Sequence, residues 1–166
     1  MKEIKVAKVT LNIGAGKDQN QLKKGLKLLN SITNAKPVET ITNKRIAGWG
    51  IRPGLPIGCK VTLRKQKATD LLQNLLKAKE SKLNEKQFDD NGNIAFGIAE
   101  YIDIPGVKYE PEIGIIGLEV CITLERAGFR IKRRKIAKRK IHKNHKITKE
   151  AAVDFMKNKF NVKVGG

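Results

Sequence analysis

The chain has 166 residues, and its 35 lysines and arginines outnumber its 16 acidic residues to give a net charge of +19 at neutral pH. This length suits one domain with one buried core, and a charge of this size attracts polyanions such as nucleic acid or an anionic membrane surface. The sequence contains no run of 18 apolar residues and no amino-terminal signal peptide, so we expect a cytoplasmic protein with no membrane partner.

The charge is unevenly distributed along the chain. Residues 1–83 carry a net charge of +13, residues 84–125 carry −7, and residues 126–149 carry +12 with no acidic residue among them. Two basic regions therefore flank an acidic one.

Periodicity predicts that the fold begins with a strand and a helix. Residues 8–14 alternate apolar and polar side chains, as a half-buried strand does. Asp18 is placed to cap the amino terminus of a following helix. The apolar stripe of that helix recurs at three- and four-residue spacing and consists of Leu22, Gly25, Leu26, Leu29 and Ile32.

Two more strands and a second helix are predicted next. Residues 38–43 follow Pro37 and alternate in type, without showing which side faces inward. Residues 57–64 form a clearer strand with one apolar face. Its other face is polar and basic and presents Gly58, Lys60, Thr62 and Arg64. A second helix of about three turns is marked by Leu71, Leu72, Leu75 and Leu76.

The second half of the chain contains two strands and a final helix. An acidic turn at residues 89–92 precedes one alternating run at 94–98, and another follows at 118–125. Thr148 is placed to cap a last helix, expected over residues 148–160. The apolar stripe of that helix consists of Ala152, Phe155, Met156 and Phe160.

The predicted order of elements is β-α-β-β-α-β-β-α, with strands often joined by loops too short for crossover helices. We therefore predict an α+β fold in two layers, with a largely antiparallel sheet and helices packed on one face. The domain is expected to span residues 1–166, with a basic extended segment at 126–149. The uncovered face of the sheet would serve as a docking surface that presents Asn12, Lys60, Thr62 and Arg64.

Enzymatic sites on nucleotides or carboxylates are poorly supported. Residues 11–18, LNIGAGKD, follow a strand as a phosphate loop does, but Leu11 and Asp18 stand where that pattern requires glycine and a hydroxyl. A strand-to-helix turn that uses glycine is the preferred interpretation. Asp89 and Asp90 lie beside Asn-Gly, so turn chemistry is favoured over acid–base catalysis. We predict no catalytic residue.

Metal and redox sites are also poorly supported. His142 and His145 have metal-ligand spacing, but they lie in a cationic run without a nearby cysteine or carboxylate, so solvated or phosphate-facing imidazoles are favoured. Cys59 and Cys121 belong to no zinc or disulfide spacing, and we expect buried or half-buried thiols. We predict no metal and no cofactor.

The basic run FRIKRRKIAKRKIHKNHK at residues 129–146 is the strongest indication of nucleic-acid binding. In isolation such a run is as readily a solvated extension. If half of its cations contacted phosphates, duplex affinity would fall about a thousandfold between about 50 and 200 mM salt. We predict that residues 126–149 become ordered only on RNA, because like charges repel. The predicted RNA-binding cations are Arg130, Lys132, Arg133, Arg134, Lys135, Lys138, Arg139 and Lys140.

Several segments resemble one protein family. Residues 44–64, KRIAGWGIRPGLPIGCKVTLR, resemble the signature of the universal large-subunit ribosomal protein family that binds 5S ribosomal RNA, called L-five in bacteria and L-eleven in eukaryotes. Residues 8–16, 88–109 and 113–129 resemble further family segments in the same order. The helix at 147–160, the basic segment and a chain that begins at the first strand are similar to the archaeal and eukaryotic branch, so an archaeal-type member is expected.

This resemblance implies a structural constituent of the large ribosomal subunit rather than an enzyme. Its expected partners are 5S ribosomal RNA, which it would help attach to the central protuberance, large-subunit ribosomal RNA, P-site tRNA and neighbouring ribosomal proteins. The family's 5S-binding positions correspond here to Asn12, Lys44, Arg45, Lys60, Thr62 and Arg64. The family's tRNA-contacting loop corresponds to Gly48, Trp49, Gly50, Ile51, Arg52, Pro53, Gly54 and Leu55, with Arg52 as its charged tip.

Three positions depart from the family pattern. Arg45 stands where the family usually has serine or threonine, which replaces a hydroxyl contact with a phosphate contact. Trp49 stands where phenylalanine is usual, and both stacking on RNA and packing at the loop base remain open. Asn91 replaces a common basic residue, so the resemblance implies no RNA role there. A stand-alone RNA-binding or RNA-chaperone module is the alternative function, with a nucleotide enzyme third.

Overall fold

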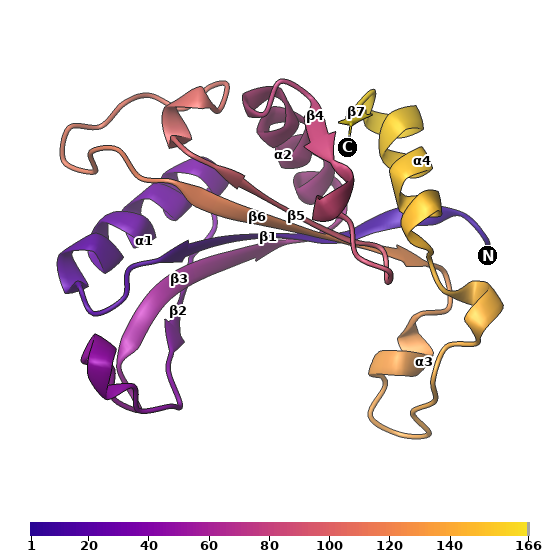
Figure 1. Ribbon diagram of the computed structural model, residues 1–166, viewed down its shortest axis with the longest axis horizontal. Coiled ribbons are helices and arrows are strands. Elements are labelled where there is room, and N and C mark those ends of the chain that lie inside the picture. Colours follow the sequence, from indigo (N-terminus) through magenta and orange to yellow (C-terminus); the bar gives the residue numbers. More distant parts are fainter. Residues whose placement is uncertain (166) are drawn as a thin grey trace.

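The computed structural model, which describes residues 1–165, confirms an α+β fold with an antiparallel sheet covered by helices on one face (Figure 1). The sheet has the strand order β2-β3-β1-β6-β5. Its strands are β1 (Ile4–Gly14), β2 (Val38–Ile41), β3 (Pro56–Leu63), β5 (Asn93–Ile98) and β6 (Leu118–Arg126). The two longest helices, α1 (Gln19–Thr33) and α2 (Lys65–Ala78), lie on the same side of this sheet. Within residues 1–165, no helix is long and apolar enough to cross a membrane.

The side chains of the central strand β1 alternate between the buried face of the sheet and its open face. Its alternate residues Val9, Leu11 and Ile13 are buried in the core, while Thr10 and Asn12 remain partly exposed. β1 begins at Ile4 rather than at the predicted residue 8. The pairing with β6 is irregular between Val6 and Lys8, and this irregularity interrupts the alternation on which the prediction rested.

Helix α1 packs closely on the sheet because Gly25 has no side chain. A Cβ atom at Gly25 would lie 3.0 Å from Cys59 Sγ and 3.3 Å from Ile13 Cγ2. Asp18 caps the helix as predicted, and its carboxylate accepts hydrogen bonds from the N–H groups of Asn20 and Gln21. The predicted stripe is shifted in one respect. Leu28 is buried, whereas Leu26 is only partly buried.

Several short elements were not predicted. The strands β4 (Lys82–Asn84) and β7 (Lys163–Gly165) pair in parallel and join the end of the chain to the segment after α2. The basic segment contains a single-turn helix, α3 (Arg130–Arg133). Helix α4 (Lys149–Phe160) was predicted, and Thr148 caps it by accepting a hydrogen bond from the Ala151 N–H. Single 3-10 turns lie at Ala47–Trp49, Glu85–Gln87, Tyr101–Asp103 and Lys143–His145.

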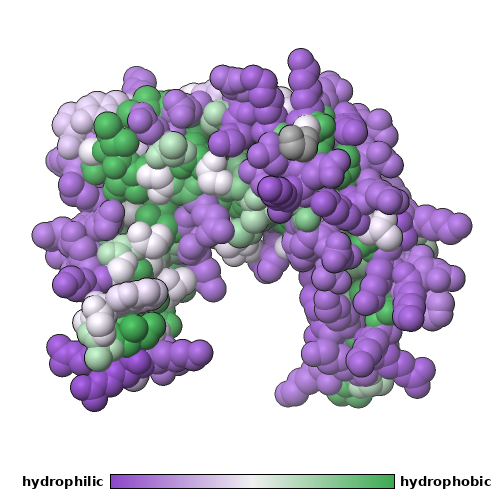
Figure 2. All heavy atoms as spheres, in the orientation of Figure 1, coloured by the Kyte–Doolittle hydropathy of each residue, from purple (hydrophilic) through white to green (hydrophobic). Residues whose placement is uncertain are grey.

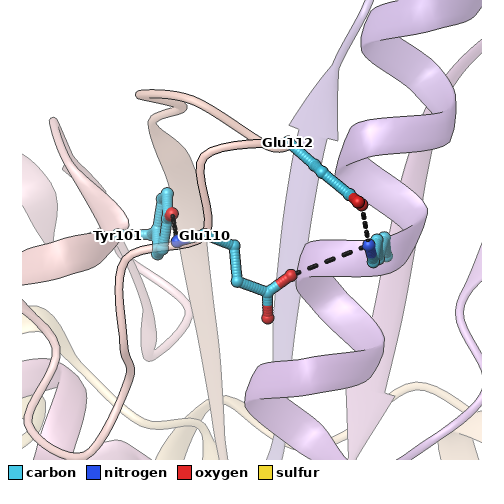
Figure 3. Close-up of polar contacts among 4 residues, drawn as sticks. Tyr101, Glu110 and Glu112 are labelled. Atoms are coloured by element: carbon cyan, nitrogen blue, oxygen red, sulfur yellow. Dashed lines mark hydrogen bonds and ion pairs between the residues drawn. The ribbon is translucent and has the colours of Figure 1, made fainter.

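The acidic loop between β5 and β6, residues 99–117, is attached to α1 (Figure 3). Lys27 of α1 forms ion pairs with Glu112 and, at 3.9 Å, with Glu110. The hydroxyl of the fully buried Tyr101 accepts a hydrogen bond from the Glu110 N–H at 3.0 Å. The hydrogen bond from Lys27 lowers the pKa of the Glu112 carboxyl below its usual value. Much of the acidic region therefore lies on the helix side of the molecule.

The turn before β5 has the Asp-Asn-Gly chemistry expected from the sequence. The Asp89 carboxylate accepts hydrogen bonds from the N–H groups of Asn91 (2.7 Å) and Asn93 (2.8 Å), and from the Asn93 side-chain amide (2.7 Å). Gly92 follows with φ +78°, and a Cβ atom there would lie 2.8 Å from Ile147 Cγ2. The turn thus packs against the residue that precedes the cap of α4.

We predict that Gly92→Ala destabilises the protein more than Gly106→Ala does. Both glycines have positive φ, but nothing lies within 4 Å of a Cβ at Gly106. Gly106→Ala should therefore cost only the left-handed strain, about 1–2 kcal/mol. Gly92→Ala should add the clash with Ile147, about 1–3 kcal/mol more. Urea denaturation measures both free energies of unfolding, and equal losses would show that the turn does not press on Ile147.

Candidate nucleic-acid interface

The open face of the sheet carries a central row of small side chains. Thr10 of β1 lies opposite Thr62 of β3 and opposite Cys121 of β6. The Thr10 and Thr62 hydroxyl oxygens are 3.3 Å apart and share a hydrogen bond. Ala95 of β5 continues the row beyond Cys121. Because these side chains are short, a ligand backbone can approach the strands closely here.

A second row on the same face brings polar groups of opposite charge together. Asn12 lies opposite Lys60 of β3 and Glu119 of β6. The Asn12 side-chain amide donates a hydrogen bond to Glu119 at 3.4 Å, while Lys60 is exposed. Arg64 lies one residue past the end of β3, in extended conformation, and makes no capping hydrogen bond to α2. The sheet thus brings together the predicted residues Asn12 of β1 and Lys60 and Thr62 of β3. Arg64 follows directly after β3.

The loop between β2 and β3, residues 42–55, forms an ordered projection that we call the finger. Its base is a set of backbone hydrogen bonds, from the Thr42 N–H to the Leu55 carbonyl (3.0 Å) and from the Gly54 N–H to the Thr42 carbonyl (2.9 Å). The buried Thr42 hydroxyl also bonds both backbone groups of Lys44. The side chains of Lys44 and Arg45, both predicted to bind RNA, are exposed beside this base.

The tip of the finger is closed by a second hydrogen-bonded pair. Ile46 and Ile51 exchange backbone hydrogen bonds of 3.0 and 3.1 Å around the Ala47–Trp49 turn, and Gly50 closes it with φ +66°. Ile51 is buried, so its side chain holds the finger together and contributes nothing to its exposed surface. The side chain of Trp49 is 68% exposed. Packing at the loop base, one of two possibilities for Trp49, is therefore wrong.

Exposed residues of the tip surround the buried Ile51. Gly48, Arg52, Pro53 and Gly54 are exposed together with Trp49 and Gly50, and only Leu55 is half-buried. Within residues 1–165, Arg52 has no acidic partner within ion-pair distance. The tip therefore offers one free cation and one free aromatic ring on a backbone fixed by hydrogen bonds.

The strand-to-helix turn that resembles a phosphate loop is occupied by the protein itself. The N–H groups of Ala15 and Gly16 both donate to the Ile57 carbonyl, at 2.9 and 3.0 Å. Asp18 places a carboxylate at the amino terminus of α1. Donors that a phosphate would require are therefore engaged, which agrees with the preference for a structural turn.

The second projection is the basic limb, residues 127–146. Arg133 forms an ion pair with Glu125 of β6 at 2.7 Å, and Arg134 Nε donates to the Ala137 carbonyl at 2.8 Å. The His145 ring bonds the Ala127 carbonyl at 2.9 Å and packs edgewise on another ring of the limb, Phe129. His145 is thus a structural residue of the limb rather than the solvated or phosphate-facing group predicted.

The cations predicted to bind RNA are spread along this limb and point into solvent. All are exposed except Arg134, which is half-buried: Arg130, Lys132, Arg133, Lys135, Lys138, Arg139 and Lys140. Apart from α3 and one 3-10 turn, the limb has no regular structure. Its ordering only on RNA stays a prediction.

The finger and the basic limb project from the side of the sheet opposite α1 and α2 (Figure 1). Figure 2 shows them as two arms of an arch, a mostly hydrophilic limb and a finger of mixed hydropathy, with a wide concave space between them below the sheet. Two segments separated by more than 70 residues thus flank one open face. We call this candidate interface, the open face with the finger and the basic limb at its ends, the saddle.

Sequence reasoning missed several residues of this saddle. Thr10 and Thr123 lie on the open face, each opposite a half-buried neighbour of β6 or β1. The alternation of β1 and β6 places both threonines on the open face, but only the pairing of the strands shows which residues they lie beside. Lys143 and Lys146 line a hollow in the basic limb, and no periodicity in their run indicated it.

The two cysteines lie on opposite faces of the sheet. Burial, with a smaller contribution from Glu39, raises the pKa of the Cys59 thiol to about 11. Cys121 lies on the open face and is half-buried. Burial, followed by the negative charge of Glu119, also raises the pKa of its thiol. Both thiols are free, as predicted.

Comparison with known proteins identifies one family along nearly the whole chain. The family model described as ribosomal protein L5 matches residues 1–52, and the model described as the C-terminus of the same ribosomal family matches residues 56–155. Large ribosomal subunit protein uL5 of Sulfolobus acidocaldarius is 46% identical over 164 residues, which cover 99% of this chain and 92% of that protein. The uL5 proteins of Nanoarchaeum equitans and Thermoplasma volcanium are 46% and 44% identical, and each alignment covers 99% of this chain and 97% of the relative.

We predict that iodoacetamide modifies Cys121 before Cys59 in the folded protein. The thiolate is the reactive form, and the raised pKa of both thiols keeps them mostly protonated at pH 8. Raising the pH to about 9 should accelerate Cys121 modification, whereas Cys59, with a pKa of about 11 and no exposed surface, should react only after unfolding. Mass spectrometry with and without urea measures both rates. Equal rates in the folded protein would contradict the assignment of the two faces.

Proposed function

The chain belongs to the ribosomal protein L5 family and is a structural, non-enzymatic constituent of the large ribosomal subunit of archaeal type, and on that premise we propose that it binds 5S ribosomal RNA through the saddle. In this proposal the open sheet face, the finger base and the basic limb contact ribosomal RNA and help attach 5S RNA to the central protuberance. The exposed finger tip contacts tRNA in the peptidyl site. Residues 1–166 form one RNA-binding domain, whose last residue, Gly166, lies outside the described residues.

The observation that supports this proposal most strongly is the arrangement of the saddle. A sheet face that no helix covers is stable if its side chains are polar or if a partner covers it. This face presents hydroxyls and an amide that can bond ribose hydroxyls and base edges. The finger and basic limb supply phosphate-binding cations on the same side. In this arrangement the open face would position the RNA, and the cations of the finger and the basic limb would supply most of the affinity.

The position of the acidic loop agrees with this orientation, whereas the acidic Glu119 lies on the open face beside Asn12. The acidic loop at residues 99–117 is tied to α1 through Lys27, Glu110 and Glu112. It therefore lies on the helix side, away from the proposed RNA. At physiological salt the screening length is about 8 Å, so charges across the molecule act only weakly on an RNA at the saddle.

We predict that the double variant Lys60→Ala/Arg64→Ala loses protection of 5S ribosomal RNA in footprinting. Removing two phosphate contacts should weaken affinity about tenfold or more at moderate salt and reduce the salt slope by about 2. A matched control is Lys23→Ala/Lys24→Ala, which removes the same charge from the exposed side of α1. Bound 5S RNA should also slow alkylation of Cys121. Unchanged footprints and affinity in the Lys60/Arg64 variant would refute the sheet-face assignment.

We predict that Arg52→Ala spares 5S binding and weakens tRNA contact. The Arg52 side chain is exposed at the finger tip, so its removal should cost one exposed charge contact, about a two- to fivefold loss of affinity. Reconstituted large subunits that carry the variant can be titrated with tRNA. Arg45→Ala, at the finger base, is the control and should weaken 5S binding instead. Loss of 5S binding in Arg52→Ala would show that tip and base do not have separate ligands.

A further inference from the structure

A hollow of about 590 Å³ lies inside the basic limb, and its walls are apolar. The Phe129 ring and the side chains of Ile141 and Ile147 line it, and Asn91 reaches it from the turn before β5. Ile147 is buried and packs on Gly92, as described above, so this wall belongs to the folded core. His145 holds the Phe129 ring edgewise at 5.6 Å. Ile147 and the Phe129 ring are thus the anchored parts of the wall, whereas most of the limb lacks regular structure.

Positive charge surrounds this apolar hollow. Six cations line it: Lys132, Lys138, Arg139, Lys140, Lys143 and Lys146. Within residues 1–165 none of the six forms an ion pair, and no acidic side chain lines the hollow. A concentration of like charge with no internal partner favours an anionic ligand.

One polar group lies among the walls. The backbone N–H of Asn91 is used in the turn, where it donates to Asp89. The side-chain amide of Asn91 makes no well-formed hydrogen bond within residues 1–165, and its weaker interaction with Asp89 is the smallest of those that lower the pKa of that carboxyl. An amide offers one acceptor and two donors, which suits the edge of a planar ring that also carries donors and acceptors.

We propose that this hollow binds one unpaired nucleotide of RNA. The base would lie against the Phe129 ring, its edge would bond the Asn91 amide, and the flanking phosphates would contact the surrounding lysines and arginines. A paired base cannot enter, because its edge and faces are covered within the duplex. An acidic peptide would satisfy the cations but not the flat apolar wall. This inference rests on the proposed RNA-binding function and adds to it a preference for an unpaired nucleotide over a paired one.

The test uses the full chain and two short RNA duplexes of equal length. One carries a single unpaired 2-aminopurine, and the other carries the same base opposite uracil. Wild type should bind the first duplex about tenfold more tightly than the second, because stacking of one base on an aromatic ring has this magnitude. The 2-aminopurine emission should rise on binding only in the unpaired duplex, since the base leaves its stacked neighbours.

Matched charge variants separate this site from general attraction. Lys140 lines the hollow and Lys135 does not, although both are exposed lysines of the same limb. Lys135→Gln should weaken both duplexes equally. Lys140→Gln and Asn91→Ala should remove most of the tenfold preference. Equal wild-type affinity for the two duplexes, or equal effects of Lys135→Gln and Lys140→Gln on the preference, would overturn the inference.

Binding of 5S ribosomal RNA, measured in parallel, distinguishes this site from the proposed function. If the Lys60→Ala/Arg64→Ala variant loses 5S binding while wild type shows no preference for the unpaired base, the proposed function stands and the hollow does not bind a nucleotide. If the preference is present while wild type fails to bind 5S RNA, the hollow stands and the proposed 5S role fails.

Discussion

The alternation of β1 between two antiparallel neighbours is the constraint on which this structure depends. Val9, Leu11 and Ile13 are buried against the helices, and each contributes about 1.5–3 kcal/mol by leaving water. The same register places Thr10 and Asn12 on the open face. A slip of one residue would move the apolar set to solvent and the polar set into the core. The core and the candidate interface are therefore fixed by one pairing.

Positive charge is concentrated on the open side of this sheet, and the acidic loop lies on the helix side. The chain must hold a net charge of +19, and like charges in a compact structure repel. Half of the lysines and arginines outside α1, α2 and α4 lie on the finger and the basic limb, which project near opposite ends of the strands (Figure 1). The acidic loop is tied to α1 by Lys27. Repulsion is reduced by distance and screening, and the side with the greater excess of positive charge is left open to a polyanion.

Most of the fold follows from local patterns in the sequence. The five sheet strands and helices α1, α2 and α4 were predicted because each has a clear period of two or 3.6 residues. β4 and β7 were missed because three residues are too few to show a period, and their pairing joins residues about 80 positions apart. Within the finger, the burial of Ile51 and the exposure of Trp49 depend on hydrogen bonds that no periodicity records. Charge showed that the limb has many cations, but not which of them surround a hollow.

The two projections differ in the internal contacts that hold them, and this difference would separate their contributions to the proposed RNA binding. The finger is closed by backbone hydrogen bonds at its base and near its tip, so a ligand need not fix its backbone. The basic limb is held by a few side-chain contacts, and fixing one residue costs about 1–2 kcal/mol. If the limb becomes ordered only on RNA, as we predict, its ordering would consume part of the free energy that its phosphate contacts release. In the proposed complex the finger would contribute geometry at little entropic cost, whereas the limb would contribute salt-dependent affinity in proportion to the cations that reach phosphates.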